Sequence, residues 1–141
     1  MRISKSLLLL FFFLLVGCSP HITISYDEES FSKIEEKDLK NTLLSFYSYL
    51  NEKNIKKMYE LESPSFRYLY PFDRYQAYYQ GFKPITTISL MEVNQTSPQV
   101  YVTKLQILLK EGKKVIYIDT WEKLDNKFFH HTIDPFFFPN K

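Results

Sequence analysis

Three side chains in the second half of the chain are of types that can transfer protons: Lys104, Asp119 and His130. Two-residue turns at Glu111-Gly112 and Asp125-Asn126 would set the pairing of the strands around them. That pairing places Lys104 opposite Asp119, with His130 in diagonal reach on the same face, because strand side chains alternate between faces. An aspartate beside a histidine can act as an acid–base pair, with the lysine tuning both groups.

The same residues have a simpler interpretation as a solvent-facing or subunit-facing surface with ordinary cross-strand ion pairs. Such pairs contribute ~0.2–1 kcal/mol each and require no cavity. Groups with catalytic pKa values usually lie in clefts, and this is the more polar face of the predicted sheet. We therefore prefer the surface interpretation and keep acid–base chemistry as the alternative. The pairing depends on register, since a shift of one residue in either hairpin moves the partners to opposite faces.

The other face is more apolar, and we expect it to pack against helices. It carries Thr103, Leu105, Ile107, Leu109, Ile116, Ile118, Thr120, Phe129, His131 and Ile133. There His131 is predicted to be a hydrogen-bonded core residue rather than a base. The polar face also holds an aromatic group, Tyr117, Trp121 and Phe128, which predicts that a second copy or a protein partner covers it.

Other chemistry finds no support in the sequence. The three glycines stand alone at positions 17, 81 and 112, so no glycine-rich phosphate loop exists, and no Gly-x-Ser-x-Gly elbow is present. His130 and His131 point to opposite faces of a strand and cannot easily share a metal ion. We predict neither a metal site nor a cofactor.

The first eighteen residues have the pattern of an export signal. Arg2 and Lys5 precede ten consecutive apolar residues, Leu7 to Val16, which are followed by Gly17 and Cys18. A helix needs about 20 apolar residues to cross a bilayer, so this run is too short to span it and fits the apolar core of a signal peptide.

The segment Leu15-Val16-Gly17-Cys18 resembles the lipobox of bacterial lipoproteins. The resemblance implies that the Cys18 thiol is acylated and that the chain is cut immediately before it. Several acyl chains on one cysteine would anchor the protein stably. Because the chain has no other cysteine, neither a disulfide within it nor a cysteine metal site is possible. The resemblance implies the bacterial cell envelope, and Ser19 favours the periplasmic side of an outer membrane where one exists.

Removal of residues 1–17 leaves 124 residues, a length that suits one domain. It also removes Arg2 and Lys5, after which 16 basic residues balance 16 acidic ones. No basic excess remains to indicate nucleic-acid binding.

Hydrophobic periodicity predicts helices followed by strands. Residues 18–37 read as a lipidated cysteine and tether, with a short edge strand at His21–Tyr26 as the alternative to a disordered spacer. The expected helices are Asp38–Asn51, Ile55–Leu61 and Phe72–Gln80, with Ser65–Tyr70 a connection. The expected strands are Ile85–Asn94, Val100–Leu109, Lys114–Leu124 and Lys127–Ile133. A domain over 38–135 would leave 136–141 as a C-terminal tail.

This order, with Asn51–Arg67 and Thr120–Pro135 in particular, resembles the NTF2-like (SnoaL-type, cystatin-like) fold. The resemblance implies an α+β domain in which N-terminal helices pack on a curved antiparallel sheet of about four strands. It also implies a pocket between helices and sheet, for which the lining candidates are Tyr47, Tyr59, Tyr75, Tyr79, Phe129 and His131. A core filled by these side chains is the alternative.

The sequence thus predicts a membrane-anchored envelope lipoprotein with a small, non-catalytic binding domain. Two alternatives stay open: a cavity enzyme of the same fold that uses Asp119 or His131 in proton transfer, and a structural subunit of an envelope assembly.

Overall fold

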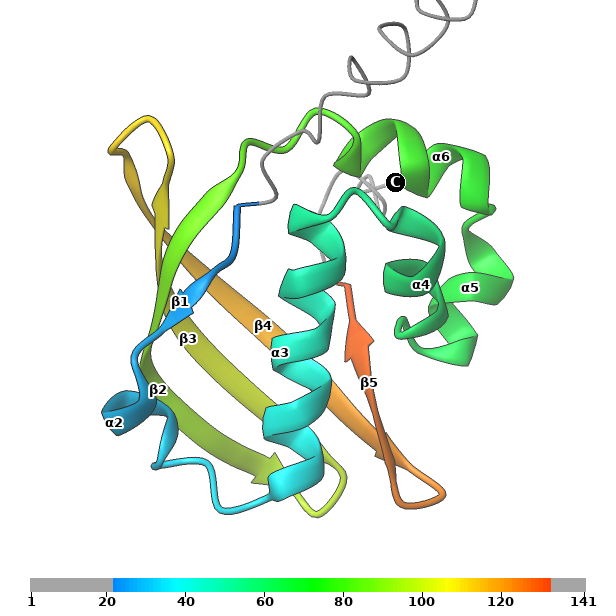
Figure 1. Cartoon of the computed structure of the whole chain (residues 1–141). Coiled ribbons are helices and arrows are strands. Elements are labelled where there is room, and N and C mark those ends of the chain that lie inside the picture. Colours follow the sequence, from blue (N-terminus) through cyan, green and yellow to red (C-terminus); the bar gives the residue numbers. More distant parts are fainter. Residues whose placement is uncertain (1–21, 133–141) are drawn as a thin grey trace, which may run out of the picture.

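A computed structural model describes residues 22–132. One strongly curled sheet wraps around helix α3, and shorter helices close one side (Figure 1). The signal peptide, the lipidation of Cys18 and the C-terminal tail fall outside the described residues and stay predictions.

The sheet has five strands in the order of the sequence. They are β1 (Ser25–Tyr26), β2 (Ile85–Ser97), β3 (Val100–Leu109), β4 (Lys114–Leu124) and β5 (Lys127–His131). β1 runs parallel to β2, and the other neighbours are antiparallel. Three register shifts between β2 and β3 bend the sheet, since each inserts a residue on one strand only. The predicted mixture of helices and sheet is confirmed, with five strands instead of four.

Helix α3 (Lys37–Asn51) crosses the concave face of the sheet (Figure 1). Its apolar stripe is buried as the sequence predicted, at Leu39, Leu43, Phe46, Tyr47 and Leu50. A stripe at i, i+4, i+7 and i+8 lies on one side of a helix, so a single face contacts the sheet along the whole length.

Three short helices follow α3: α4 (Ile55–Glu60), α5 (Pro64–Leu69) and α6 (Phe72–Tyr79). The prediction of an irregular connection at Ser65–Tyr70 was wrong. Ser63 accepts a hydrogen bond from the backbone N–H of Phe66, and Pro64 occupies the first turn of α5. The Ser63-Pro64 pair therefore begins a helix instead of an irregular connection.

The segment predicted as a tether belongs largely to the fold. The alternative edge strand is present, since Ser25 and Tyr26 pair with β2, and a helical turn, α2 (Glu28–Phe31), follows. Ile24, Phe31 and Ile34 are buried in the core. The domain therefore begins well before residue 38, because these apolar side chains are held by sheet pairing more than 50 residues later in the chain.

The predicted register of β3 with β4 was wrong by one residue. Asp119 lies opposite Thr103, not Lys104. The connection is longer than a two-residue turn: the N–H of Gly112 donates to the carbonyl of Leu109 at 2.8 Å, and Gly112 takes a φ of 87°. In the second hairpin Asp125 and Asn126 form the expected two-residue turn with φ of 48° and 60°, and Trp121 lies opposite His130 as predicted.

The two faces of β4 and β5 are consequently the reverse of those expected. Trp121 and Phe128 are 0% and 4% exposed on the concave side, so the predicted partner surface that they form with half-buried Tyr117 does not lie outside. Ile116 and Ile118, predicted to be core, are 50% and 61% exposed on the convex side. Because the β3–β4 loop is longer than predicted, the pairing of β3 with β4 differs by one residue from the prediction. The face of β4 and β5 that carries Trp121 and Phe128 is therefore the one in the core.

Candidate functional site

A cavity of about 610 Å³ lies between the concave face of the sheet and helices α3 and α6. Its walls include Phe46, Tyr47, Leu50, Tyr78, Tyr79, Phe82, Ile107, Leu109, Val115 and Tyr117, and its polar lining includes Asp119, His130 and Thr132. Lys83, Glu111 and Lys113 are the charged residues of its rim. The space is therefore open, and the alternative of a completely filled core is wrong.

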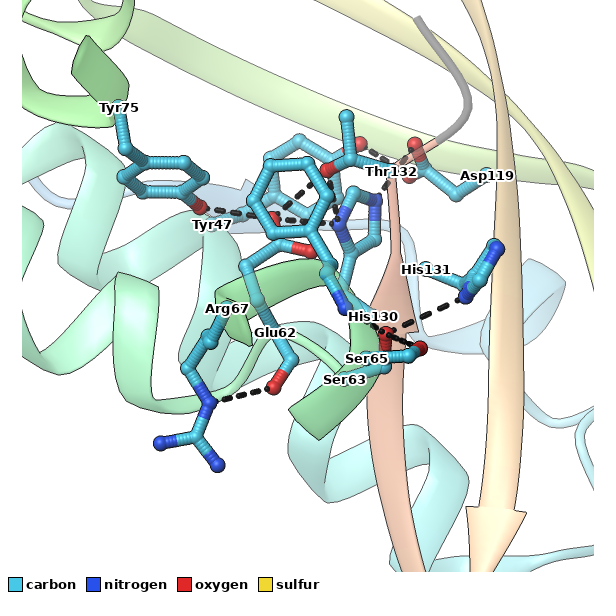
Figure 2. Close-up of polar contacts among 11 residues, drawn as sticks. Tyr47, Glu62, Ser63, Ser65, Arg67, Tyr75, Asp119, His130, His131 and Thr132 are labelled. Carbon is cyan, nitrogen blue, oxygen red and sulfur yellow. Dashed lines mark hydrogen bonds and ion pairs between the residues drawn. The ribbon is translucent and has the colours of Figure 1, made fainter. Parts of the chain in front are cut away.

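His130 lies between two buried carboxylates beside this cavity (Figure 2). Its Nδ1 is 2.9 Å from Oε1 of Glu62, and its Nε2 is 3.3 Å from Oδ1 of Asp119. Ionised carboxylates only accept hydrogen bonds, so both ring nitrogens carry a proton and the ring is an imidazolium.

The charges around His130 agree with that geometry. Burial by itself lowers the pKa of His130, but the charge of Glu62 and hydrogen bonds to Asp119 and Glu62 raise it to about 10. A ring with both nitrogens bound to carboxylates cannot accept another proton, so His130 is not a general base in this arrangement.

Hydroxyl groups complete the network. Tyr75 and Thr132 donate to Oε1 of Glu62 at 2.7 and 2.8 Å, and Tyr47 donates to Oδ2 of Asp119. Burial, and secondarily the neighbouring carboxylates, raise the pKa of Tyr47 and Tyr75. Both hydroxyls therefore stay protonated and act as donors toward the carboxylates (Figure 2).

Main-chain bonds place Glu62 beside His130. The N–H of His130 donates to the carbonyl of Leu61, and the N–H of Ser63 donates to the carbonyl of His130, each at 2.8 Å. The link between α4 and α5 thus lies along β5 as a short bridge. The side chain of Glu62 is held against the histidine by the backbone on both sides.

Aromatic rings fix the plane of the imidazolium. The ring of Phe46 stacks on it at a centroid distance of 4.2 Å, and Trp121 meets it edge-on at 5.0 Å. Aromatic faces stabilise a cation electrostatically and leave it little freedom to rotate.

In this network two carboxylates share one imidazolium. Oε2 of Glu62 is buried and has no hydrogen-bond partner among the described residues. Arg67 binds the main-chain carbonyl of Glu62 and not its carboxylate. Of the two carboxylates, Asp119 is the one that lines the cavity. A ligand in the cavity would therefore contact the Asp119 carboxylate and not that of Glu62.

The structure unites some predicted site residues and separates others. Asp119 and His130 meet as predicted, but on the buried face. Lys104 lies on the convex side opposite Ile118, away from both. His131 is half-buried and faces away from the core; its Nδ1 is 3.2 Å from the Ser63 hydroxyl, although the residue borders the cavity.

The predicted pocket lining was correct in part. Tyr47 and Tyr79 line the cavity with His131, whereas Tyr59, Tyr75 and Phe129 do not. Tyr59 instead donates to the carbonyl of Arg67 at 3.1 Å and packs against the ring of Tyr75.

Two important residues, Glu62 and Thr132, were missed by the sequence reading. Glu62 stands between an apolar residue and a Ser-Pro pair, the context of an exposed loop. No local signal marks its burial, which comes from a strand 68 residues later. Strand alternation predicts Thr132 on the same face as His130, and the structure agrees, but Thr132 was not named as a site residue.

Within residues 22–132, no group of three or more His, Cys, Asp or Glu side chains is arranged to hold a metal ion. Over the same residues, no helix is long and apolar enough to cross a membrane.

Comparisons with known proteins show the fold alone. No protein-family model matches the chain, and no curated protein matches its sequence. A solved structure of a SEC-C motif containing protein from Psychrobacter arcticus is similar with a TM-score of 0.57 and 9% identity, over 71% of this chain. A SEC-C motif containing protein from Rhodopseudomonas palustris matches at 0.53 and 11% identity, over 69% of this chain and 77% of that one. The match with the Psychrobacter arcticus protein spans 62% of the length of that protein.

Proposed function

We propose that this protein is a lipid-anchored component of the bacterial envelope whose domain binds a small amphiphilic molecule in the cavity under α3. The ligand has an apolar or aromatic body and ends in a hydrogen-bond donor or a positive charge. The observation that carries the proposal is an open aromatic cavity with the carboxylate of Asp119 in its lining.

The walls select the body of the ligand. A cavity of about 610 Å³ is of the size that small-molecule sites have, ~300–1,000 Å³. Rings from α3, α6 and β4 surround it, among them Phe46, Tyr79 and Tyr117. An apolar ligand would lose water-exposed surface against these rings, which is the main driving force for such binding.

The polar lining selects the other end of the ligand. The two N–H groups of His130 are already bound to carboxylates, and the hydroxyl proton of Tyr47 points to Asp119. Within this network, Asp119 is therefore the group that offers acceptor positions to a ligand in the cavity. An amine or ammonium group fits because it would donate to the carboxylate and contact tyrosine faces.

The lipobox residues ending in Cys18 support the anchor. The helix α3 inside a curled sheet, with a cavity between them, supports assignment of the domain to the NTF2-like fold. Replacement of Cys18 by Ser tests the anchor: the variant should keep an unprocessed leader and carry no lipid. A normally processed, membrane-bound C18S protein would exclude the lipoprotein assignment.

A cavity enzyme is the second candidate, favoured by the contact of Asp119 with His130. In such an enzyme Asp119 would accept the proton, since His130 already carries both of its own. Its polarised carboxylate would take a proton from a bound substrate, and His130 would be a positioning residue.

Binding can be measured on the full-length protein in detergent with three matched probes. These are 4-phenylbutylamine, 4-phenylbutanol and 4-phenylbutyrate, which share the phenylbutyl skeleton and end in an ammonium, a hydroxyl and a carboxylate group. Trp121 is the single tryptophan and lies in contact with His130 and Phe46, so its fluorescence reports occupancy of the site. We expect the amine to bind most tightly and the carboxylate least, and saturation-transfer NMR gives an independent readout.

A pair of matched variants shows where the probes bind. Val115 lines the cavity, so Val115→Trp should fill it and abolish binding of all three probes in saturation-transfer NMR, a readout that the added tryptophan does not disturb. Val102 is half-buried on the convex face, where Val102→Trp should leave binding unchanged. If no probe binds to the wild-type protein, or if both variants bind alike, the cavity is not the ligand site.

A further inference from the structure

The folded domain begins very close to the predicted lipid. The main-chain carbonyl of Ile22 accepts a hydrogen bond from Asn51 Nδ2 at 2.7 Å, and Ile24 is buried. Only four residue steps separate Cys18 from Ile22, and they span at most about 14 Å in any conformation. A lipid on Cys18 therefore holds the end of α3 that carries Asn51 near the bilayer.

That same end holds the rim of the cavity. Asn51 Oδ1 accepts from the N–H of Ile85 at 2.7 Å, which ties the start of β2 to the end of α3. The N–H of Lys110 donates to the carbonyl of Pro84 at 2.8 Å, which adds the β3–β4 connection. Figure 1 shows the β3–β4 loop, the α6–β2 connection and the end of α3 together at one end of the molecule.

We call this end the mouth face and define it as residues 52–53, 81–84 and 110–114. Exposed lysines dominate it: Lys53, Lys83, Lys110, Lys113 and Lys114, against Glu52 and Glu111 as the acidic residues. The exported chain as a whole is neutral, with 16 basic and 16 acidic residues, so this end of the molecule holds a local basic excess. Lysines near an anionic lipid surface are attracted to it within about a Debye length.

We infer that the mouth face rests on an anionic lipid surface, so that the cavity opens toward the bilayer and receives its ligand from it. The inference rests on the proposed anchor at Cys18 and adds an orientation. An amphiphile could then pass from the membrane into the cavity without exposing its apolar body to water. The partner is the lipid headgroup layer, to which the lysines are complementary in charge.

Labels at the two ends of the molecule test the orientation. The only native thiol is acylated in the anchored protein, so an introduced cysteine is the single free thiol. Lys113→Cys puts a fluorophore on the mouth face, and Ser97→Cys puts it at the far end of the sheet. The ten residues of β3 rise ~3.3 Å each, which separates the two sites by roughly 30 Å.

The lipidated protein, cut before Cys18, is reconstituted into vesicles of phosphatidylethanolamine and phosphatidylglycerol that carry a headgroup-attached quencher. We expect the label at 113 to be quenched at least about fivefold more than the label at 97. Equal quenching at both sites, or stronger quenching at 97, would overturn the orientation while leaving the anchor intact. Protein that does not stay with the vesicles would instead contradict the anchor.

The contribution of charge is tested with lysines outside the cavity lining. The double variant Lys110→Gln, Lys114→Gln should roughly halve the quenching of the label at 113. Vesicles without phosphatidylglycerol should have the same effect on the wild-type protein. If neither change alters the quenching, the lysines do not contact the lipid and the proposed surface is wrong.

Discussion

His130 and His131 are consecutive in β5, yet they belong to two different chemical environments. His130 faces the concave side of the sheet, where carboxylates occupy both ring nitrogens and aromatic rings surround it. His131 faces away from the core, half-buried, and contacts the hydroxyl of Ser63. Consecutive residues of a strand point to opposite faces of the sheet. In this curled sheet, one face places a histidine in a buried charge network and the other places it on the surface.

The same comparison extends along β4. Asp119 is 7% exposed and Trp121 fully buried, whereas the alternating Ile118 is 61% exposed. Residue type does not explain this pattern, since an aspartate is inside and an isoleucine outside. Trp121 and the Asp119 carboxylate are buried because they face α3, where Phe46 contacts the indole ring and the Tyr47 hydroxyl donates to the carboxylate.

The largest difference in unfolding free energy between the two faces of β5 should come from replacing each histidine in turn. His130→Asn leaves Glu62 and Asp119 buried without their shared cation, and we expect it to cost ~3–5 kcal/mol of unfolding free energy. His131→Asn loses one partly exposed hydrogen bond and should cost ~1 kcal/mol or less. Denaturation followed by Trp121 fluorescence measures both; equal losses would mean that the buried network contributes no more than the surface contact.

The pH dependence of stability should come from the concave face. The pKa of His130 is raised from 6.5 to about 10 in the folded protein, so its stabilising contribution is complete below pH 6.5 and disappears as the pH rises through 10. The groups that face it are Glu62, Asp119, Thr132 and, through the carboxylates, the hydroxyls of Tyr47 and Tyr75.

Over that window the unfolding free energy should fall by several kcal/mol, at ~1.4 kcal/mol for each unit of pKa shift. The His131→Asn protein should show the same fall. Denaturation curves at pH 6, 8 and 10 measure it. A stability that stays constant from pH 6 to 10 would show that His130 is not held as an imidazolium.

Substitutions should change ligand affinity by less free energy than they change stability. Asp119→Asn keeps the shape of the cavity lining and removes its charge, so affinity for 4-phenylbutylamine should fall about tenfold, ~1.4 kcal/mol. Affinity for 4-phenylbutanol should change less than about twofold, because the alcohol does not need the charge. Asp73→Asn, an exposed position on α6, is the matched control and should alter neither value.

The smallest effect is expected on the convex face. Ile118→Thr removes exposed apolar surface from β4 and keeps a β-branched side chain, so unfolding free energy should change by less than ~0.5 kcal/mol. Leu105 is fully buried on the concave side of β3, so Leu105→Ala should lower the unfolding free energy by ~2–5 kcal/mol. A large loss for Ile118→Thr would indicate that another molecule covers this face.

Local patterns predicted the elements that depend on near neighbours. The apolar stripe from Leu39 to Leu50 follows the helical period, and burial of that stripe is what the period requires. Asp125-Asn126 tolerates the left-handed backbone of a two-residue turn, so the β4–β5 register was predicted correctly. The β3–β4 register failed because Glu111-Gly112 is compatible with more than one loop length.

By itself the sequence determined the α3 stripe, the second hairpin, and the contact of Asp119 with His130. Tertiary structure decided which face of the sheet became the core, and it brought Glu62 to His130 from 68 residues away. The physical reason is that a helical or strand period reports only which residues share a side. Which side is buried, and with what charge, depends on loop lengths and on segments distant in the chain.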